Sequence, residues 1–440
     1  MNIDFTLLTP EFLLTALGFL VLGADLTVNR SQRNTVTAAV TLSGLLSIGI
    51  FSVIFLWDKE TSLYGGIYRI DHYALLFKAI FMSIGFITVM MSVEYVGKRM
   101  HHPGEFYSLI VFSVLGSSML AASGELLTAF ISLELLSFSL YVLVSLPRGD
   151  RRSAEAGTKY ILLGALSTAI MLYGISILYG TLGTTMFSTI GSVLAFSIQS
   201  PSVIIGMAML LAGLGFKLAA VPFHMWAPDV YEGSPTPVTG YLSVLSKAAG
   251  FALVLRFFSE SLLTSIDQWQ LTLAVIAAAT MTVGNLTALA QTNIKRLLAY
   301  SSIGQVGFLM VGLVALSPNA STALILHLVG YAFTNLTVFM VVIFVENQTG
   351  GEEVSDFSGL ANRSPFSALA MTAALFSLAG LPIFAGFITK FYLFTAASEQ
   401  GFLWLAAVAI TNSLVSLYYY LRIIRQMYVE EPSDSSTLKL

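Results

Sequence analysis

The sequence predicts an all-α polytopic membrane protein with about thirteen transmembrane helices. Hydrophobic residues make up 56% of the chain and charged residues only 10%, whereas a soluble domain carries about 25% charged residues. The apolar residues gather in runs of roughly 20, the length that a helix needs to cross a bilayer. A chain of this composition cannot cover itself with a water-facing surface, so we expect it to lie in a membrane.

Thirteen apolar runs follow one another along the chain, and each is interpreted as one span. The twelfth run is too long for one straight crossing and contains "GLPIFAG", so we expect a helix broken near Pro382. Residues 182–200 carry no charge and are expected to form a loop with a short interfacial helix. The thirteen runs occupy residues 11–28, 36–56, 73–95, 106–122, 124–146, 157–180, 202–221, 237–259, 270–290, 298–316, 321–345, 365–397 and 402–424.

The basic residues predict an outside N-terminus and an inside C-terminus. With that orientation only Lys59 and Arg69 lie in outside loops. Inside loops of membrane proteins carry an excess of Lys and Arg, which is the distribution obtained here. The residues placed inside are Arg30, Arg33, Lys98, Arg99, Arg148, Arg151, Arg152, Lys295, Arg296, Arg363, Arg422, Arg425 and Lys439.

The composition also excludes several classes of function. The chain has no cysteine, so it has no disulfides, iron–sulfur clusters or thiolate metal sites. No glycine-rich phosphate loop follows a strand, and no Cys/His cluster is present, so we expect no cofactor and no metal in this chain. The net charge of −3 does not indicate nucleic acid. The N-terminus has no basic region of the kind found in a signal peptide.

Three lysines lie deep inside predicted spans: Lys217, Lys247 and Lys390. A Lys at the centre of a membrane helix costs roughly 2.5–3.5 kcal/mol, so a function is the default interpretation. A buried lysine releases its proton more readily than an arginine does. The set is therefore interpreted as a proton relay. Three other cations near span ends are interpreted as snorkelling residues, namely Lys78, Lys159 and Arg256.

A counter-charge for these lysines is Glu134, at the centre of the fifth span. Glu125 lies at the outer end of that span, where an acid is tolerated, and is discounted. A carboxylate close to Lys217 stabilises its charge, and a weaker pair favours release of the proton. The alternative is a static ion pair that only fixes helix packing. Three lysines, one acid and two broken helices together favour the relay.

Two prolines interrupt spans close to these lysines. Pro222 lies five residues after Lys217, and Pro382 lies eight residues before Lys390. Broken helices in membranes survive where protein or water satisfies the freed backbone groups, and such breaks often line ion sites. The two broken spans are five spans apart, which indicates an internal repeat of about five helices. Because five is odd, the two copies are expected to be inverted.

Two histidines are candidates for passing protons, because histidine titrates nearest neutral pH. His224 follows the first break and is the stronger candidate. His327 lies in the eleventh span and is equally compatible with a packing role. Asp229 and Glu232, in the inner loop after the break, either guide protons or are simply solvated.

The residues around these positions resemble a known family. "GFKLAAVPFHMWAPDVYEGSPTPV", "SKAAGF", "NIKRLLAYSSIGQVGF" and "GLPIFAGFITKFYLF" look like the N-type subunits of proton-pumping NADH:quinone oxidoreductase (respiratory complex I) and their plastid-type counterparts. Both belong to the wider family of Mrp antiporter-like subunits. The resemblance covers residues 11–428, and "YEGSPTP" with "KAAG" favours the N-type over the L-type and M-type subunits and over the Mrp antiporters.

The resemblance implies a domain organisation. It comprises a three-helix segment (1–104), a first repeat (105–260, spans 4–8), a second, inverted repeat (261–428, spans 9–13) and a polar tail (429–440). The family usually has fourteen helices, with helices 7 and 12 broken. Its relay residues correspond here to Glu134, Lys217, Lys247 and Lys390. Gln305 stands where many members have His, so the resemblance implies no relay role there.

The resemblance also implies a function. The chain is expected to be a proton-translocating membrane-arm subunit that couples quinone reduction in other subunits to proton pumping. NADH, FMN, iron–sulfur clusters and quinone are expected in partner subunits. The expected neighbours are K-type and M-type subunits, the lateral helix of an L-type subunit and the lipid bilayer. The expected location is a bacterial inner membrane, with the thylakoid membrane as the alternative. Alternative functions are a subunit of an Mrp-type antiporter or membrane-bound hydrogenase, or a non-transporting scaffold.

Overall fold

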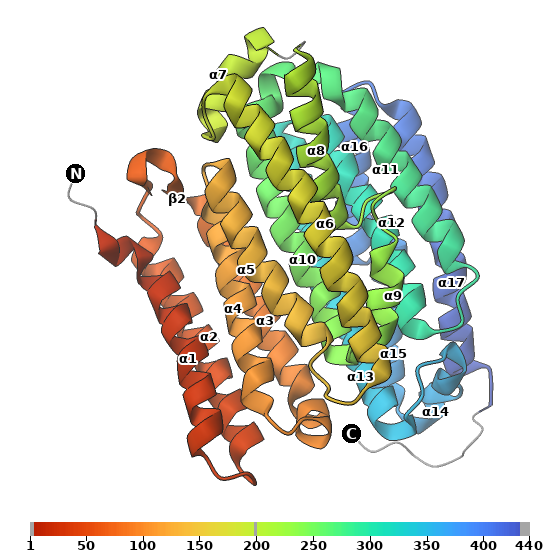
Figure 1. The fold of residues 1–440 in the computed structure, drawn as a ribbon. Helices are drawn as coiled ribbons and strands as arrows, with labels where there is room; N and C mark the ends of the chain where they lie inside the picture. Colours follow the sequence, from red (N-terminus) through yellow and green to blue (C-terminus); the bar gives the residue numbers. More distant parts are fainter. Residues whose placement is uncertain (1–3, 198–199, 432–440) are drawn as a thin grey trace. The chain divides into compact units, whose positions relative to one another are not determined.

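The computed structural model describes residues 4–197 and 200–431, and this part of the chain is almost entirely helical (Figure 1). Twelve of the described helices are long and apolar enough to cross a membrane. The run at 365–397 is divided into two shorter helices, α15 (Pro365–Ala379) and α16 (Ala385–Glu399). The predicted all-α membrane fold is therefore confirmed. Lys439 and most of the predicted polar tail lie outside the described residues.

The described helices gather in two compact units. The first unit contains the chain up to Lys217 together with Leu245–Ile266. In it, α1 packs against α2 and α4, and α4 also packs against α3 and α5. Its helices are η1 (Phe5–Leu8), α1 (Thr9–Thr27), α2 (Arg33–Leu56), α3 (His72–Arg99), α4 (Pro103–Ala122), α5 (Leu126–Val144), α6 (Arg151–Leu182), α7 (Phe187–Ser197) and α8 (Pro201–Leu218).

The second unit contains Leu218–Val244 and the chain from Asp267 onward. In it, α12 packs against α9, α11, α13 and α16, and α11 also packs against α17. Its helices are α9 (Trp226–Gly233), α11 (Asp267–Ala288), α12 (Ile294–Ala315), α13 (Pro318–Thr349), η5 (Val354–Phe357), α14 (Leu360–Arg363), α15, α16 and α17 (Leu403–Tyr428).

One helix, α10 (Thr236–Phe257), contributes residues to both units. Its first residues belong to the second unit, and Leu245 onward belongs to the first. The helix continues through one π-helical turn, η3 (Phe258–Leu262), and one 3₁₀ turn, η4 (Leu263–Ser265). The chain therefore leaves the first unit after α8 and re-enters it within α10. The predicted repeats at 105–260 and 261–428 stay a prediction.

A short antiparallel ribbon joins α2 to α3, which the sequence did not predict. Strand β1 (Thr61–Leu63) pairs with β2 (Tyr68–Ile70) in the register Thr61↔Ile70. The turn between the strands, η2 (Tyr64–Gly66), contains Gly65 with a φ of 73°. The two strands have only three residues each, too few for an alternating pattern to stand out from the neighbouring apolar runs.

Polar residues fix where several helices begin. Asp71 accepts a hydrogen bond from the backbone of Ala74 at the start of α3, and Glu125 accepts from Leu127 and Thr128 at the start of α5. Such N-caps satisfy backbone N–H groups that have no partner inside the helix, and replacing one costs about 1 kcal/mol. The predicted short helix in 182–200 is α7, which ends at Ser197.

Candidate functional site

The first site is built on one face of α5. Glu134, Ser137 and Tyr141 are spaced by three and four residues, so their side chains lie on the same face of the helix. Lys217, in the last turn of α8, approaches this face. The carbonyl end of a helix favours a positive charge, so the position of Lys217 on α8 is itself stabilising.

Hydroxyl groups hold the ammonium of Lys217 more closely than the carboxylate does. Lys217 Nζ donates to Ser137 Oγ at 2.7 Å and to Tyr141 Oη at 3.2 Å. Glu134 Oε1 lies 3.9 Å from Lys217 Nζ, so the two charges attract each other without a direct hydrogen bond. The Lys217 side chain is 7% exposed and that of Glu134 18% exposed. The pair is therefore largely desolvated, and neutral hydroxyls hold the ammonium.

Helix α6 completes the surroundings of the pair. Thr168 Oγ1 donates to Glu134 Oε1 at 3.1 Å. The ring of Tyr141 packs edge-on against Tyr160, with ring centroids 4.6 Å apart. Gly164 lies against the Tyr141 hydroxyl, and a Cβ at this position would overlap it. The close approach of α6 at Gly164 therefore fixes the position of the Tyr141 hydroxyl, which accepts a hydrogen bond from Lys217.

The chain is interrupted immediately after Lys217. Helix α8 ends at Leu218, α9 begins at Trp226, and Pro222 lies between them. Ala219 has a φ of 60°, which turns the chain out of the helix. Within the second unit, the freed backbone N–H of Val221 donates to Thr280 Oγ1 at 3.0 Å. The break is therefore satisfied by protein groups, as a membrane requires.

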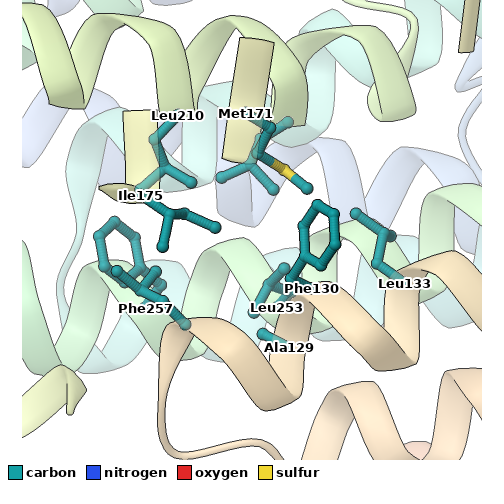
Figure 2. Close-up of a pocket in the computed structure, with 10 residues that line it drawn as sticks. Ala129, Phe130, Leu133, Met171, Ile175, Leu210, Leu253 and Phe257 are labelled. Carbon is teal, nitrogen blue, oxygen red and sulfur yellow. The ribbon is translucent and has the colours of Figure 1, made fainter. Parts of the chain in front are cut away.

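A small apolar cavity lies next to the pair, toward the start of α5. Figure 2 shows its side chains from α5, α6, α8 and α10 pointing toward one another. Its volume is about 10 Å³, about the minimum for one water molecule. None of the lining side chains bears a hydroxyl, an amide or a charge. The lining residues are Leu126, Ala129, Phe130, Leu133, Met171, Ile175, Leu210, Leu214, Leu253 and Phe257.

The second site lies in the second unit, at the break between α15 and α16. Lys390 Nζ donates to the carbonyl of Leu378 at 2.8 Å and lies 3.2 Å from Ser413 Oγ. The ring centroid of Phe308 is 4.2 Å from the same ammonium. Because α15 ends at Ala379, its last carbonyls have no helical partner and are free to accept from the lysine. Pro382 lies in the break.

Lys390 has no carboxylate within 4.0 Å among the described residues, so carbonyl dipoles and an aromatic face stabilise its charge. His327 lies close by. Its Nδ1 is 2.8 Å from Oγ1 of Thr389, the neighbour of Lys390 in the chain. His327 Nε2 is buried and has no hydrogen bond. The structure thus brings His327 and Lys390 to one place.

The remaining predicted residues lie in α10, in the break before α9 and in α9 itself. Lys247 is buried in α10, with 1% of the residue exposed. His224 lies in the break before α9. Asp229 and Glu232 bind Arg296 through its Nη1, at 2.8 and 2.9 Å. These two acids are therefore paired rather than freely solvated.

Two cations predicted to snorkel are in fact buried in ion pairs within the first unit, so that prediction was wrong. Lys78 Nζ lies 2.5 Å from Glu11 Oε1, which also accepts from the hydroxyl of Tyr68. Arg256 donates through Nη1 and Nη2 to the two oxygens of Asp71, both at 2.8 Å. Each pair joins positions far apart in the sequence, which the position of a cation within its own span does not reveal.

Asp71 lies just outside α3, where it also serves as the N-cap. Burial raises the pKa of its carboxyl, but the guanidinium of Arg256 and the backbone N–H of Ala74 outweigh burial and lower that pKa below its usual value. Asp71 therefore stays charged well into the acidic range. Among the described residues no group of three or more His, Cys, Asp or Glu side chains could hold a metal ion.

Comparison with known proteins defines the class. The family described as NADH:quinone oxidoreductase/Mrp antiporter, transmembrane, matches residues 123–416. The chain belongs to this family.

Individual relatives and solved structures are more specific. The chain is 42% identical to NADH-quinone oxidoreductase subunit N of Desulforamulus reducens, covering 100% of this chain and 91% of that protein. It is 44% identical to subunit N of Moorella thermoacetica, covering 98% and 90%.

Among solved structures, a chain of respiratory complex I from Thermus thermophilus is similar, with 32% identity, a TM-score of 0.81 and coverage of 98% and 92%. A chain of the archaeal membrane-bound sulfane sulfur reductase has 26% identity, a TM-score of 0.88 and coverage of 99% and 91%.

Proposed function

We propose that this chain is the N-type membrane-arm subunit of a proton-translocating NADH:quinone oxidoreductase. The observation that carries the proposal is the environment of Lys217, a buried lysine at the end of an interrupted helix, 3.9 Å from Glu134. The identity of 42–44% to proteins named subunit N over nearly the full chain supports the particular complex. Electron transfer is proposed to take place in other subunits of the complex.

The proposed driver is electron transfer to quinone in other subunits, which changes the distance between Glu134 and Lys217. When the carboxylate moves away, the ammonium loses its counter-charge and its proton is released. When the carboxylate returns, the amine takes up another proton. Moving one charge against 100 mV requires about 2.3 kcal/mol, which a two-unit change in a pKa can supply.

Ser137 and Tyr141 are proposed to take part in this exchange. Each hydroxyl accepts a hydrogen bond from the ammonium and can donate one to the neutral amine. Their distances of 2.7 and 3.2 Å are within hydrogen-bond reach, so a proton can pass without a large displacement of Lys217. From there the proposed relay continues to Lys247 and then to Lys390, with His327 beside the last lysine and His224 at the first break.

The apolar cavity beside Glu134 supports the proposal that protons do not pass from this pair toward the start of α5. It lies toward the start of α5, which the charge distribution predicts to face outside. Its lining offers a proton no group to bind, and its volume of about 10 Å³ leaves little room for water. Protons taken up at Glu134 and Lys217 are therefore proposed to leave by way of the other lysines.

The proposed complex also has defined neighbouring subunits, cofactors and a membrane location. Membrane-arm subunits of K-type and M-type and the lateral helix of an L-type subunit are the proposed neighbours. NADH, FMN, iron–sulfur clusters and quinone are proposed to belong to partner subunits. The proposed location is a bacterial inner membrane with the N-terminus outside, in accord with the distribution of basic residues.

The substitution Lys217→Met tests the proposal in the assembled complex. Electron transfer from NADH to quinone and proton uptake into inverted membrane vesicles are recorded together. We expect assembly to persist while both activities fall, since the two processes are coupled. The matched control is Lys159→Met, because Lys159 lies in the same unit in an exposed pair with Glu155. Wild-type activities in Lys217→Met would support the scaffold alternative instead.

The family also includes Mrp antiporters, so an antiporter or hydrogenase subunit is the second candidate. Purification of the chain with its natural partners separates the two. Quinone-reductase subunits in the purified complex support the proposal, and antiporter or hydrogenase subunits contradict it.

A further inference from the structure

A second cavity, unrelated to the buried lysines, lies where two turns of the first unit meet. One turn joins α1 to α2 and the other joins α3 to α4. The cavity has a volume of about 370 Å³, in the lower range of small-molecule pockets. Its lining is polar and largely basic, and consists of Arg30, Arg33, Asn34, Gly97, Met100, His101, His102 and Pro103.

The two arginines of this cavity retain hydrogen-bonding capacity. Arg30 is exposed, and its guanidinium has no hydrogen bond or ion pair in the part of the chain that the structure describes. Arg33 is only 15% exposed; its Nη1 lies 3.5 Å from Nδ1 of His102, and its Nε is buried without a hydrogen bond. These contacts leave most of its five N–H donors unused, so an oxygen-rich ligand that reaches its terminal nitrogens from the cavity would stabilise the guanidinium.

One acid, Asp25, lies beneath the cavity, but most of its capacity is already used. Its Oδ1 accepts from the backbone of Gly104 at 2.9 Å, and its Oδ2 lies 3.2 Å from Nδ1 of His102. Arg33 Nε is 3.9 Å from Asp25, too far for a hydrogen bond.

Other acids near this end are also paired: Glu94 with Lys98 and Glu105 with Arg148. The local balance of charge at the cavity is therefore positive.

One helix N-terminus adds to this positive balance. Helix α2 begins at Arg33, which lines the cavity, and its N-cap residue makes no side-chain hydrogen bond to the helix. The first turn of a long helix attracts anions through its free N–H groups and the helix dipole. Helix α4 also begins at the cavity, at Pro103, but Asp25 already accepts from its Gly104 N–H and Glu105 lies in its first turn. Two arginine side chains, the start of α2 and a cavity thus converge on one place.

The position of the cavity identifies the ligand. It lies at the ends of four apolar helices, each long enough to cross a membrane. This is the level at which lipid phosphates lie, and basic pockets between helices at this level bind anionic headgroups. We propose that this cavity binds the phosphate group of an anionic ligand, with the headgroup of an anionic phospholipid as the source.

The test uses the purified, delipidated complex. Phosphatidylglycerol or phosphatidylcholine is added in mixed micelles, and bound lipid is counted by native mass spectrometry. Arg30→Gln is the main variant, because Arg30 is exposed and has no partner among residues 4–197 and 200–431, so we expect the variant to fold. We expect its affinity for phosphatidylglycerol to fall about fivefold, and that of Arg30→Gln/Arg33→Gln to fall about 30-fold, with phosphatidylcholine unchanged.

Arg425→Gln is the matched control, since Arg425 is 71% exposed and far from the cavity in sequence. Equal losses in Arg30→Gln and Arg425→Gln would overturn the site. A parallel titration with inorganic phosphate separates the two sources of the group. If phosphate binds the wild type better than Arg30→Gln while phosphatidylglycerol binds no better than phosphatidylcholine, the lipid assignment is overturned in favour of a free anion.

Discussion

At the scale of single residues, the ammonium of Lys217 is hydrogen-bonded to hydroxyl groups and not to a carboxylate. Its ammonium donates to Ser137 at 2.7 Å, while Glu134 stays 3.9 Å away. A direct contact with the carboxylate would bind the proton tightly and slow its release. The observed distance of 3.9 Å fits the proposal that this proton is exchangeable, the property that a relay needs.

The substitution Ser137→Ala tests this role. It removes the shortest hydrogen bond to the ammonium, and hydrogen bonds to charged groups contribute about 1.5–3 kcal/mol. We expect proton pumping to fall about tenfold while assembly of the complex is retained. Ser139→Ala is the control on the same helix, because Ser139 donates only to the carbonyl of Leu135. Equal effects of the two substitutions would show that Ser137 serves only packing.

Part of this site could be predicted from the sequence. A charge in the middle of an apolar run is conspicuous, which singled out Lys217, Lys390 and Glu134. Ser137 and Tyr141 follow Glu134 at helical spacing, and this spacing is the signal in the sequence that places their hydroxyls on the same face of α5. The pair of Arg256 with Asp71 joins residues 185 positions apart, so no local pattern indicates it.

At the scale of elements, a broken helix supplies the groups that hold a buried cation. The last carbonyls of α15 point to Lys390 because Gly380, with a φ of 80°, ends the helix there. A continuous helix would have used those carbonyls in its own hydrogen bonds. The interruption therefore creates a polar site without adding a second charge.

Gly380→Ala tests the link between the break and Lys390. The added Cβ would lie 3.0 Å from Lys390 Cδ, in a backbone conformation that side chains disfavour. We expect a loss of about 1 kcal/mol in stability and a marked fall in proton pumping. Gly350→Ala is the matched control, since Gly350 has a φ of 74° and open space around its Cβ. Comparable pumping in the two variants would contradict a role for this geometry.

Asp71→Asn tests the ion pair between Asp71, at the start of α3, and Arg256, near the end of α10. It leaves Arg256 buried without its bidentate partner, and we expect a cost of about 2 kcal/mol, measured as a lower melting temperature of the complex. Glu94→Gln, in an exposed pair with Lys98, should cost less than about 0.5 kcal/mol.

The effect of Asp71→Asn also has a defined dependence on pH. Because folding lowers the pKa of Asp71, its contribution is present at neutral pH and is lost only as the pH falls through that lowered value. The difference in melting temperature between the wild type and Asp71→Asn should be the same at about pH 7 and about pH 5. A difference that already shrinks at pH 5 would contradict the lowered pKa.

The elements themselves were mostly predictable, because each long apolar run has one stable form in a membrane. The helix ends differ from the predicted ones where polar residues extend a helix beyond its apolar part, as in α6, which begins at Arg151 rather than at residue 157. No sequence pattern predicts the three-residue strands, because so short an alternation does not stand out. The place of the breaks was indicated by proline.

At the scale of the whole molecule, a similar local arrangement occurs in each of the two compact units. Each unit has a buried lysine close to an interrupted helix, Lys217 in the first and Lys390 in the second. Lys247 lies on α10, the helix that contributes residues to both units. The division of the chain between the units could not be predicted from the sequence, because it depends on long-range packing within α10.

In the proposed relay, Lys217 exchanges its proton and does not merely supply a charge. Lys217→Arg separates the two, because arginine keeps the positive charge but does not release its proton under these conditions. The measurement is proton uptake per electron pair in vesicles that contain fully assembled complex. We expect Lys217→Arg to lose pumping as fully as Lys217→Met does. Wild-type pumping in Lys217→Arg would contradict the relay and identify the pair with Glu134 as structural.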